Sequence, residues 1–142
     1  MSKMIIGFSG SANSGKTKAL HRLISILENT QVISDQDLVK VISYKGKNIG
    51  ISTGGDYKDH VTQSLSTLVP ECDIVITACR TYGGTHDAID AWQNISTNIT
   101  YISCPYFSPQ KVRNKDIPKN ELEVFYEAKA RMLLSYLDSL IS

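Results

Sequence analysis

The sequence lacks an excess of either charge and has few cysteines. Its 15 lysines and arginines are balanced by 14 aspartates and glutamates, which leaves a formal net charge of +1. A protein that coats nucleic acid without sequence preference needs a clear basic excess to neutralise phosphates, so that class is disfavoured. The three cysteines, Cys72, Cys79 and Cys104, form no CxxC pair and are odd in number. This argues against a disulfide framework and against a structural zinc site.

Long apolar runs are also lacking. No stretch approaches the roughly 20 residues that a membrane-spanning helix requires. Residues 1–3 lead straight into an apolar segment without the pattern of a signal peptide. These features predict a cytoplasmic protein with reduced cysteines and no membrane contact. The length of 142 residues and the hydrophobic content of 42% suit a single domain over residues 1–142.

Segments rich in β-forming residues occur at intervals along the chain. Residues 3–9 and 73–79 are short apolar runs that suit buried strands. Residues 38–52 contain two β-rich runs around a glycine-containing turn, which predicts an antiparallel hairpin. Shorter strands are expected at 31–34 and 99–103.

Helical patterns alternate with these strands. After the first strand, apolar residues recur at three- and four-residue spacing, which predicts a helix with one buried face. Asp56 is an acceptable N-cap for a second helix, and Thr85 can cap a short third one. Asn120 followed by Glu123 resembles a capping box that opens a long final helix. The alternation predicts an α/β fold, a three-layer sandwich with a mainly parallel sheet and one antiparallel hairpin.

A glycine-rich motif lies between the first strand and the first helix. Residues 10–17 read G-S-A-N-S-G-K-T, a complete match to G-x-x-x-x-G-K-[ST]. Gly10 and Gly15 permit backbone angles that turn successive N–H groups toward one anion. The helix N-terminus adds unpaired donors and the positive end of its dipole. Lys16 then supplies a positive charge to the β- and γ-phosphates, and the Thr17 hydroxyl can bind Mg²⁺.

In this strand–helix context the motif resembles that of the P-loop NTPases. The resemblance is specific for residues 5–28 and implies a P-loop NTPase fold, with a nucleoside triphosphate and Mg²⁺ bound at the C-terminal edge of a parallel sheet. The residues implied for nucleotide binding in this segment are Gly10, Ser11, Ala12, Asn13, Ser14, Gly15, Lys16, Thr17 and Lys18.

P-loop proteins also need an acid at the end of another strand to organise the metal. The strand at 73–79 does not supply it, because its acid stands at the start. Asp35-Gln36-Asp37 follows the short strand at 31–34 and resembles the D-x-D of small-molecule kinases of the shikimate-kinase type. That resemblance implies that Asp35 and Asp37 contact Mg²⁺ and the acceptor hydroxyl. Two acids near a strand end more often form a solvated turn, which is the alternative.

A second candidate segment is Ile49–Asp56, which reads I-G-I-S-T-G-G-D. It resembles the switch II region of G-protein-type NTPases, which implies that Gly54 and Gly55 sense the γ-phosphate. Ser52 stands where that family has Asp, and Asp56 comes four residues later. Asp56 is therefore predicted to be catalytic, with a purely helix-capping role as the alternative.

The strand at 73–79 leads into a further candidate, Arg80. Loops at this edge of an open α/β sheet carry function, so Arg80 can neutralise charge that develops on a phosphate. The alternative is an exposed arginine beside an ordinary turn. The basic, proline-containing segment 104–118 can close over phosphates as a lid or form a solvated connection. Within it, Asn114-Lys115-Asp116 lacks the final Asp of the guanine-reading N-K-x-D pattern, so adenine is favoured by default.

The histidines His21, His60 and His86 stand singly and are expected at the surface. Together these patterns predict Mg²⁺-dependent binding of ATP or another nucleoside triphosphate and hydrolysis of its γ-phosphate. A kinase with a small-molecule acceptor, a nucleotide-dependent binding module and a loop that binds a different anion are the alternatives. The predicted catalytic residues are Lys16, Arg80 and Asp56, and the predicted metal ligands are Thr17, Asp35 and Asp37.

Overall fold

The computed structural model describes residues 3–10, 15–31, 36–93, 97–105 and 119–141. Its strands are β1 (Lys3–Ser9), β2 (Val39–Tyr44), β3 (Lys47–Ser52), β4 (Ile74–Cys79) and β5 (Thr97–Ser103). Its helices are α1 (Lys16–Glu28), α2 (Lys58–Leu68), α3 (Gly84–Asp90) and α4 (Lys119–Ile141). Within these ranges, none of the helices has both the length and the apolar character needed to cross a membrane.

The five strands form one sheet in the order β2-β3-β4-β1-β5. β1 pairs in parallel with β4 and β5, and β3 pairs in parallel with β4. β2 alone runs antiparallel, because it is joined to β3 by the tight turn at Lys45-Gly46. The predicted α/β class and the predicted antiparallel hairpin are therefore confirmed.

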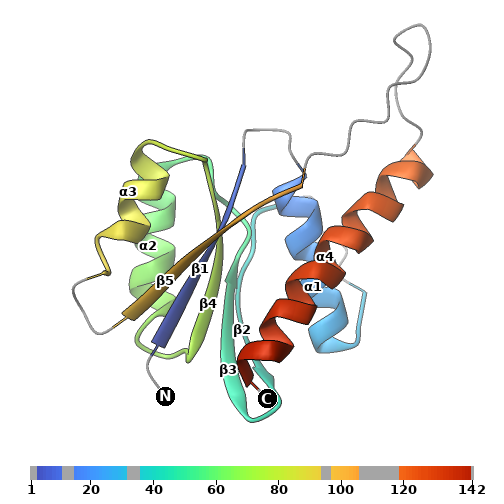
Figure 1. Cartoon of the computed structure of the whole chain (residues 1–142), viewed down its shortest axis with the longest axis horizontal. Coiled ribbons are helices and arrows are strands. Elements are labelled where there is room, and N and C mark those ends of the chain that lie inside the picture. The colour runs from blue at the N-terminus through green and yellow to red at the C-terminus, as the bar shows by residue number, and fades with distance from the viewer. Residues whose placement is uncertain (1–2, 11–14, 32–35, 94–96, 106–118, 142) are drawn as a thin grey trace, which may run out of the picture.

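Helices cover both faces of the sheet (Figure 1). α1 packs beside α4 on one face, and α2 packs beside α3 on the other. The first interface is filled by apolar residues such as Leu20, Leu23 and Leu133, all buried against Phe8. The second is filled from α2 and α3 against Val75. The layers are therefore helix, sheet and helix, as the sequence predicts.

Strand direction brings several loop segments to one edge of the sheet. In the parallel ladder Ser9 aligns with both Cys79 and Ser103, so β1, β4 and β5 end side by side. β3 ends at the same edge, where Ser52 pairs with Val39 at the start of β2. The segments before β2 and after β1, β3 and β4 therefore meet there, and they include most of the residues predicted to be functional.

The long final helix α4 is fastened near both ends. Near its start, Arg22 of α1 forms ion pairs with Glu123 and Glu127. Near its end, Asp138 accepts hydrogen bonds from the Tyr44 hydroxyl at 2.7 Å and the Lys45 ammonium at 3.1 Å. These bonds lower the pKa of the Asp138 carboxyl. The predicted capping box is wrong. α4 begins at Lys119, before Asn120, and the Glu123 carboxylate is paired with Arg22.

Two expected helix caps are also wrong. α2 begins at Lys58 with Tyr57 as its N-cap, so Asp56 precedes the cap. Gly83 is the N-cap of α3, and the Thr85 hydroxyl instead accepts the backbone N–H of Arg80 at 2.8 Å. Both polar side chains are used in tertiary contacts with the loop after β4. The short strand expected at 31–34 lies outside the described residues.

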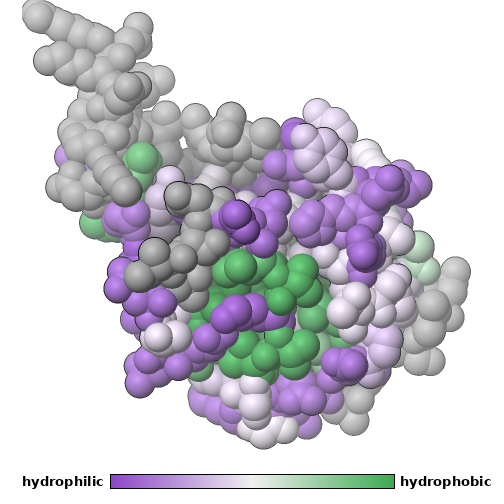
Figure 2. All heavy atoms as spheres, turned by 180° about the vertical axis from the view of Figure 1, so that it is seen from behind, coloured by the Kyte–Doolittle hydropathy of each residue, from purple (hydrophilic) through white to green (hydrophobic). Residues whose placement is uncertain are grey.

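Part of the surface is apolar. Viewed from behind, hydrophobic side chains gather in the middle of the face and hydrophilic ones surround them (Figure 2). The edge strand β2 itself exposes Val39 and Val41, which retain 44% and 47% of their accessible surface. Hydrophobic side chains are therefore not confined to the interior.

Candidate functional site

The glycine-rich motif ends where α1 begins. Gly15 is the N-cap of α1 and has φ +88°, a left-handed conformation that favours glycine. Lys16 follows in the first turn, is only 5% exposed, and donates a hydrogen bond to the Gly10 carbonyl at 2.6 Å. The Lys16 ammonium therefore reaches back to the residue that directly follows β1. The predicted binding residues Ser11, Ala12, Asn13 and Ser14 lie outside the described residues.

The three residues predicted to be catalytic come together at this point. Asp56 Oδ1 lies 3.1 Å from Arg80 Nε and 4.0 Å from Lys16 Nζ. The carboxylate thus bridges a buried ammonium from the start of α1 and a guanidinium from the end of β4. Burial lowers the pKa of Lys16, and the nearby Asp56 charge partly offsets this shift.

Thr53 connects the start of α1 to the β2–β3 hairpin. The Thr17 hydroxyl donates to the Thr53 carbonyl at 3.0 Å. The Thr53 N–H donates to the Leu38 carbonyl at 2.9 Å, and the Leu38 N–H donates to the Thr53 hydroxyl at 2.7 Å. All three polar groups of Thr53 are therefore engaged. This holds Thr17, a predicted metal ligand, against the loop that carries Asp56.

The two glycines after Thr53 lie in tight surroundings. A Cβ atom at Gly55 would lie 2.4 Å from the carbonyl carbon of Ala78, so this backbone packs directly on β4. A Cβ atom at Gly54 would lie 2.9 Å from Asp37 Oδ2. Asp37 is thus beside the loop that follows β3, at the functional edge, and is exposed to solvent. Asp35, its predicted partner in metal binding, lies outside the described residues.

The position where switch II proteins carry Asp is closed to solvent here. Ser52 is fully buried, and its hydroxyl has no hydrogen-bond partner among the residues that the structure describes. Cys79 at the end of β4 is also buried, which raises the pKa of its thiol to about 12. The thiol stays protonated at neutral pH and is a poor nucleophile. Ser52 and Cys79 therefore add no charge to this edge, whereas Lys16, Asp56 and Arg80 do.

A small cavity of about 290 Å³ opens beside these charges. It is lined by Asp56, Arg80, Thr81 and Tyr82. Tyr82 is 83% exposed, and Tyr57 on the other loop is 75% exposed. The cavity thus has one accessible aromatic ring, that of Tyr82, beside the ion pair of Asp56 and Arg80.

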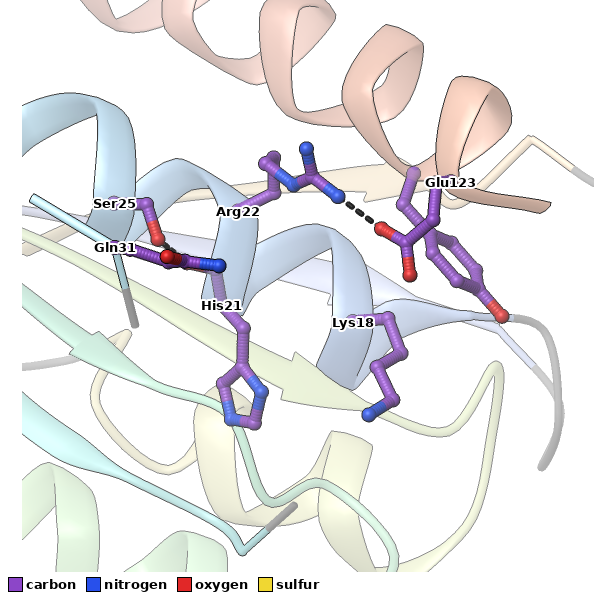
Figure 3. Close-up of a pocket in the computed structure, with 7 residues that line it drawn as sticks. Lys18, His21, Arg22, Ser25, Gln31 and Glu123 are labelled. Carbon is purple, nitrogen blue, oxygen red and sulfur yellow. Dashed lines mark hydrogen bonds and ion pairs between the residues drawn. The ribbon is translucent and has the colours of Figure 1, made fainter. Parts of the chain in front are cut away.

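A larger cavity of about 510 Å³ lies along the flank of α1 and is bordered by the first part of α4 (Figure 3). It is lined by Lys18, His21, Arg22, Ser25, Gln31, Glu123 and Tyr126. In Figure 3, Arg22 points toward Glu123 of α4, while Lys18 and His21 point to another side of α1. Lys18, predicted to bind nucleotide, is therefore part of this wall and is exposed. The surface position expected for His21 is wrong, because it is 6% exposed on the flank of α1.

Two residues of α4 at the glycine-rich loop were missed by the sequence patterns. A Cβ atom at Gly15 would lie 3.1 Å from both Lys129 Nζ and Tyr126 Cε1. Lys129 is only 4% exposed. One signal was available, because Lys129 occupies an inward position four residues before the buried Leu133. A lysine in an apolar helical stripe marks an ammonium that the fold must accommodate.

The donors at this edge suit Mg²⁺ better than a metal held wholly by protein. The structure describes no group of three or more His, Cys, Asp or Glu side chains that could hold a metal. Mg²⁺ takes one or two carboxylates and completes its shell with phosphate oxygens and water. The Thr17 hydroxyl and the Asp37 carboxylate are donors of that kind on neighbouring segments. The segment proposed as a lid, mostly within 106–118, lies outside the described residues.

Comparison with known proteins gives no match: no family model, no curated protein and no solved structure matches the chain.

Proposed function

We propose that the protein binds a nucleoside triphosphate, ATP in preference to GTP, together with Mg²⁺, and hydrolyses the γ-phosphate. The observation that carries this proposal is the convergence of Asp56 and Arg80 on Lys16, a buried lysine in the first turn of α1. The complete G-x-x-x-x-G-K-[ST] motif precedes the same helix. The motif supports phosphate binding, and the neighbouring charges support chemistry at the terminal phosphate.

Phosphate binding rests on backbone donors and Lys16. The backbone N–H groups in the first turn of an α-helix point toward its N-terminus, where together with the helix dipole they favour an anion. On binding, Lys16 exchanges the Gly10 carbonyl for a phosphate oxygen, which is a stronger, charge-assisted acceptor. Its lowered pKa reflects the cost of burying the ammonium, and a bound phosphate relieves that cost.

Thr17 and Asp37 are the described residues that would hold Mg²⁺, and the ion would supply positive charge to the β- and γ-phosphate oxygens. The Thr17 hydroxyl donates a hydrogen bond to the Thr53 carbonyl. The lone pairs of its oxygen therefore remain available to bind a cation.

Asp56 and Arg80 would act on the terminal phosphate. A water molecule attacks the γ-phosphorus while the bond to the β–γ bridging oxygen breaks, giving ADP and phosphate. The Asp56 carboxylate can accept a hydrogen bond from that water and orient it. Arg80, released from Asp56, neutralises charge on the transferred group. Positioning and charge neutralisation supply most of the rate enhancement in such reactions.

The test is calorimetric titration with non-hydrolysable ATP and GTP analogues, each with and without Mg²⁺. Lys16→Ala should abolish binding, because a charge-assisted contact to phosphate is lost. Lys40→Ala, at a half-exposed lysine paired with Glu28, is the matched control and should bind as the wild type does. If ATP raises the melting temperature of Lys16→Ala as much as that of the wild type, the proposal is wrong.

The kinase alternative is favoured by one observation, the position of Asp37 beside Gly54 at the same edge. Steady-state phosphate release distinguishes the two reactions. A hydrolase should lose activity in Asp56→Asn and keep it in Asp35→Asn. A kinase should depend on Asp35 and Asp37, and a nucleoside monophosphate or small alcohol should accelerate ADP release about tenfold. Nucleotide binding without turnover under all these conditions would favour the binding module.

A further inference from the structure

Lys129 is a buried charged residue that has no role in the proposed hydrolysis. It lies in the middle of α4 and is 4% exposed. Its ammonium reaches the glycine-rich loop, since a Cβ atom at Gly15 would lie 3.1 Å from Lys129 Nζ. A lysine is almost never fully buried unless its ammonium is hydrogen-bonded or paired with an anionic group.

The position of this ammonium is fixed by the packing of α4. The helix lies along α1, and Arg22 ties it there through Glu123 and Glu127. Tyr126, one turn before Lys129, packs its ring against Gly15 as well. The packing of α4 against α1 therefore holds the Lys129 ammonium beside the N-terminus of α1.

Two buried ammonium groups thus lie at the two ends of the glycine-rich motif. Lys16 Nζ donates to the Gly10 carbonyl and lies near Asp56, on the loop that leads into α2. Lys129 Nζ comes from α4, which packs beside α1, and lies next to Gly15. The N-terminus of α1 adds further positive potential at the same point. Such an arrangement attracts an anion with several charges spread along its length.

We propose that Lys129 is a second phosphate-binding lysine, which contacts the part of the polyphosphate that ADP and ATP share. This inference rests on the proposed function. It follows from the neighbours of each lysine: Lys16 lies 4.0 Å from Asp56, which pairs with Arg80 where the γ-phosphate would lie, whereas Lys129 Nζ lies beside Gly15. Lys129 is therefore a binding residue for both substrate and product, supplied from a helix far along the chain.

The test compares the dissociation constants of ADP and of a non-hydrolysable ATP analogue for wild type, Lys129→Met and Lys129→Arg. Lys129→Met keeps the length of the side chain and should weaken both ligands at least tenfold and by similar factors. Lys129→Arg keeps the charge and should bind within about threefold of the wild type. Arg131→Met, on the exposed face of the same helix, is the control and should bind as the wild type does.

A second measurement reads Lys129 directly in the wild-type protein. The lysine side-chain ¹³Cε resonance that disappears in Lys129→Arg is assigned to Lys129, and adding ADP should shift it whereas adding adenosine should not. This keeps the inference testable if Lys129→Met does not fold. If the wild type binds neither nucleotide, the proposed function fails. If the wild type binds both and Lys129→Met binds equally well, or the resonance does not respond to ADP, the inference alone is overturned.

Discussion

The Asp56 carboxylate lies beside two cations that the proposed function assigns to phosphate, and this predicts that a charge-removing substitution strengthens nucleotide binding. Its carboxylate lies 3.1 Å from Arg80 Nε and 4.0 Å from Lys16 Nζ. A bound triphosphate would need both cations and would add its own repulsion with the carboxylate. Asp56→Asn, which keeps the shape and removes the charge, should therefore strengthen nucleotide binding while it slows hydrolysis.

The size of the effect follows from the distances and the exposure. In a water-like dielectric, unit charges at these separations attract by about 1 kcal/mol per pair. That dielectric is appropriate because the Asp56 side chain is 50% exposed. Exposed ion pairs often retain less, about 0.2–1 kcal/mol each. Loss of both pairs should relieve about 0.4–2 kcal/mol of competition, so affinity should rise about 2- to 30-fold.

The assay is titration of ADP and of a non-hydrolysable ATP analogue without Mg²⁺, which keeps any role of the carboxylate in metal binding out of the measurement. Asp59→Asn, at an exposed acid in the first turn of α2, is the control for net charge. The gain should shrink as salt is raised, because exposed charges are screened. Equal or weaker binding by Asp56→Asn would refute the idea that this carboxylate competes with phosphate.

Other perturbations test single contacts. Thr17→Ala should weaken ATP binding about tenfold with Mg²⁺ and within about twofold without it, as titrations under both conditions would show; an identical loss would remove Thr17 from the metal shell. Arg80→Ala should lower kcat about a hundredfold or more and change the ATP Kd much less, and an unchanged rate at saturating ATP would make it an ordinary surface residue. Gly55→Ala should lower the melting temperature by roughly 4–10 °C, because its Cβ would lie 2.4 Å from backbone of Ala78; an unchanged melting curve would contradict this packing. Burial lowers the Lys16 pKa below its usual 10.5. In titrations at increasing pH, ATP affinity should be full below that lowered pKa and should fall as the pH rises through it. An affinity that stays constant up to pH 10.5 would argue against a role for this ammonium.

The sequence predicts the fold well where periodicity decides the structure. The buried strands β1 and β4 are short apolar runs, and the β2–β3 hairpin has a glycine turn, so local pattern and tertiary structure agree. Helix starts were predicted less well. Asp56 and Thr85 are good caps in isolation, but each contacts Arg80 instead: Asp56 through an ion pair between distant segments, and Thr85 through a hydrogen bond to a residue five positions earlier. A capping preference of about 1 kcal/mol is easily outweighed by such contacts.

In the candidate site too, residues of a local motif were predicted from the sequence, and residues placed by tertiary packing were not. Lys16, Thr17 and the glycines belong to a local motif whose spacing can be recognised directly. The pairing of Asp56 with Arg80 depends on β3 and β4 ending side by side, which the predicted alternation of elements makes plausible but does not fix. The approach of Lys129 depends on the packing of α4 against α1, and the buried position of His21 on what covers one flank of a helix. Neither leaves a spacing signature of its own.

The position of β1 in the sheet also has a consequence for how the protein folds. Both of its neighbours are distant in sequence, since Met4 aligns with Ile74 and Lys3 with Thr97. The β2–β3 hairpin, in contrast, closes over a two-residue turn and can form within microseconds. Contacts between distant segments are slow to form, because chain entropy is lost before they contribute. The strand that precedes the glycine-rich motif should therefore be among the last to pair, so the proposed nucleotide site should form together with the central core and not before it.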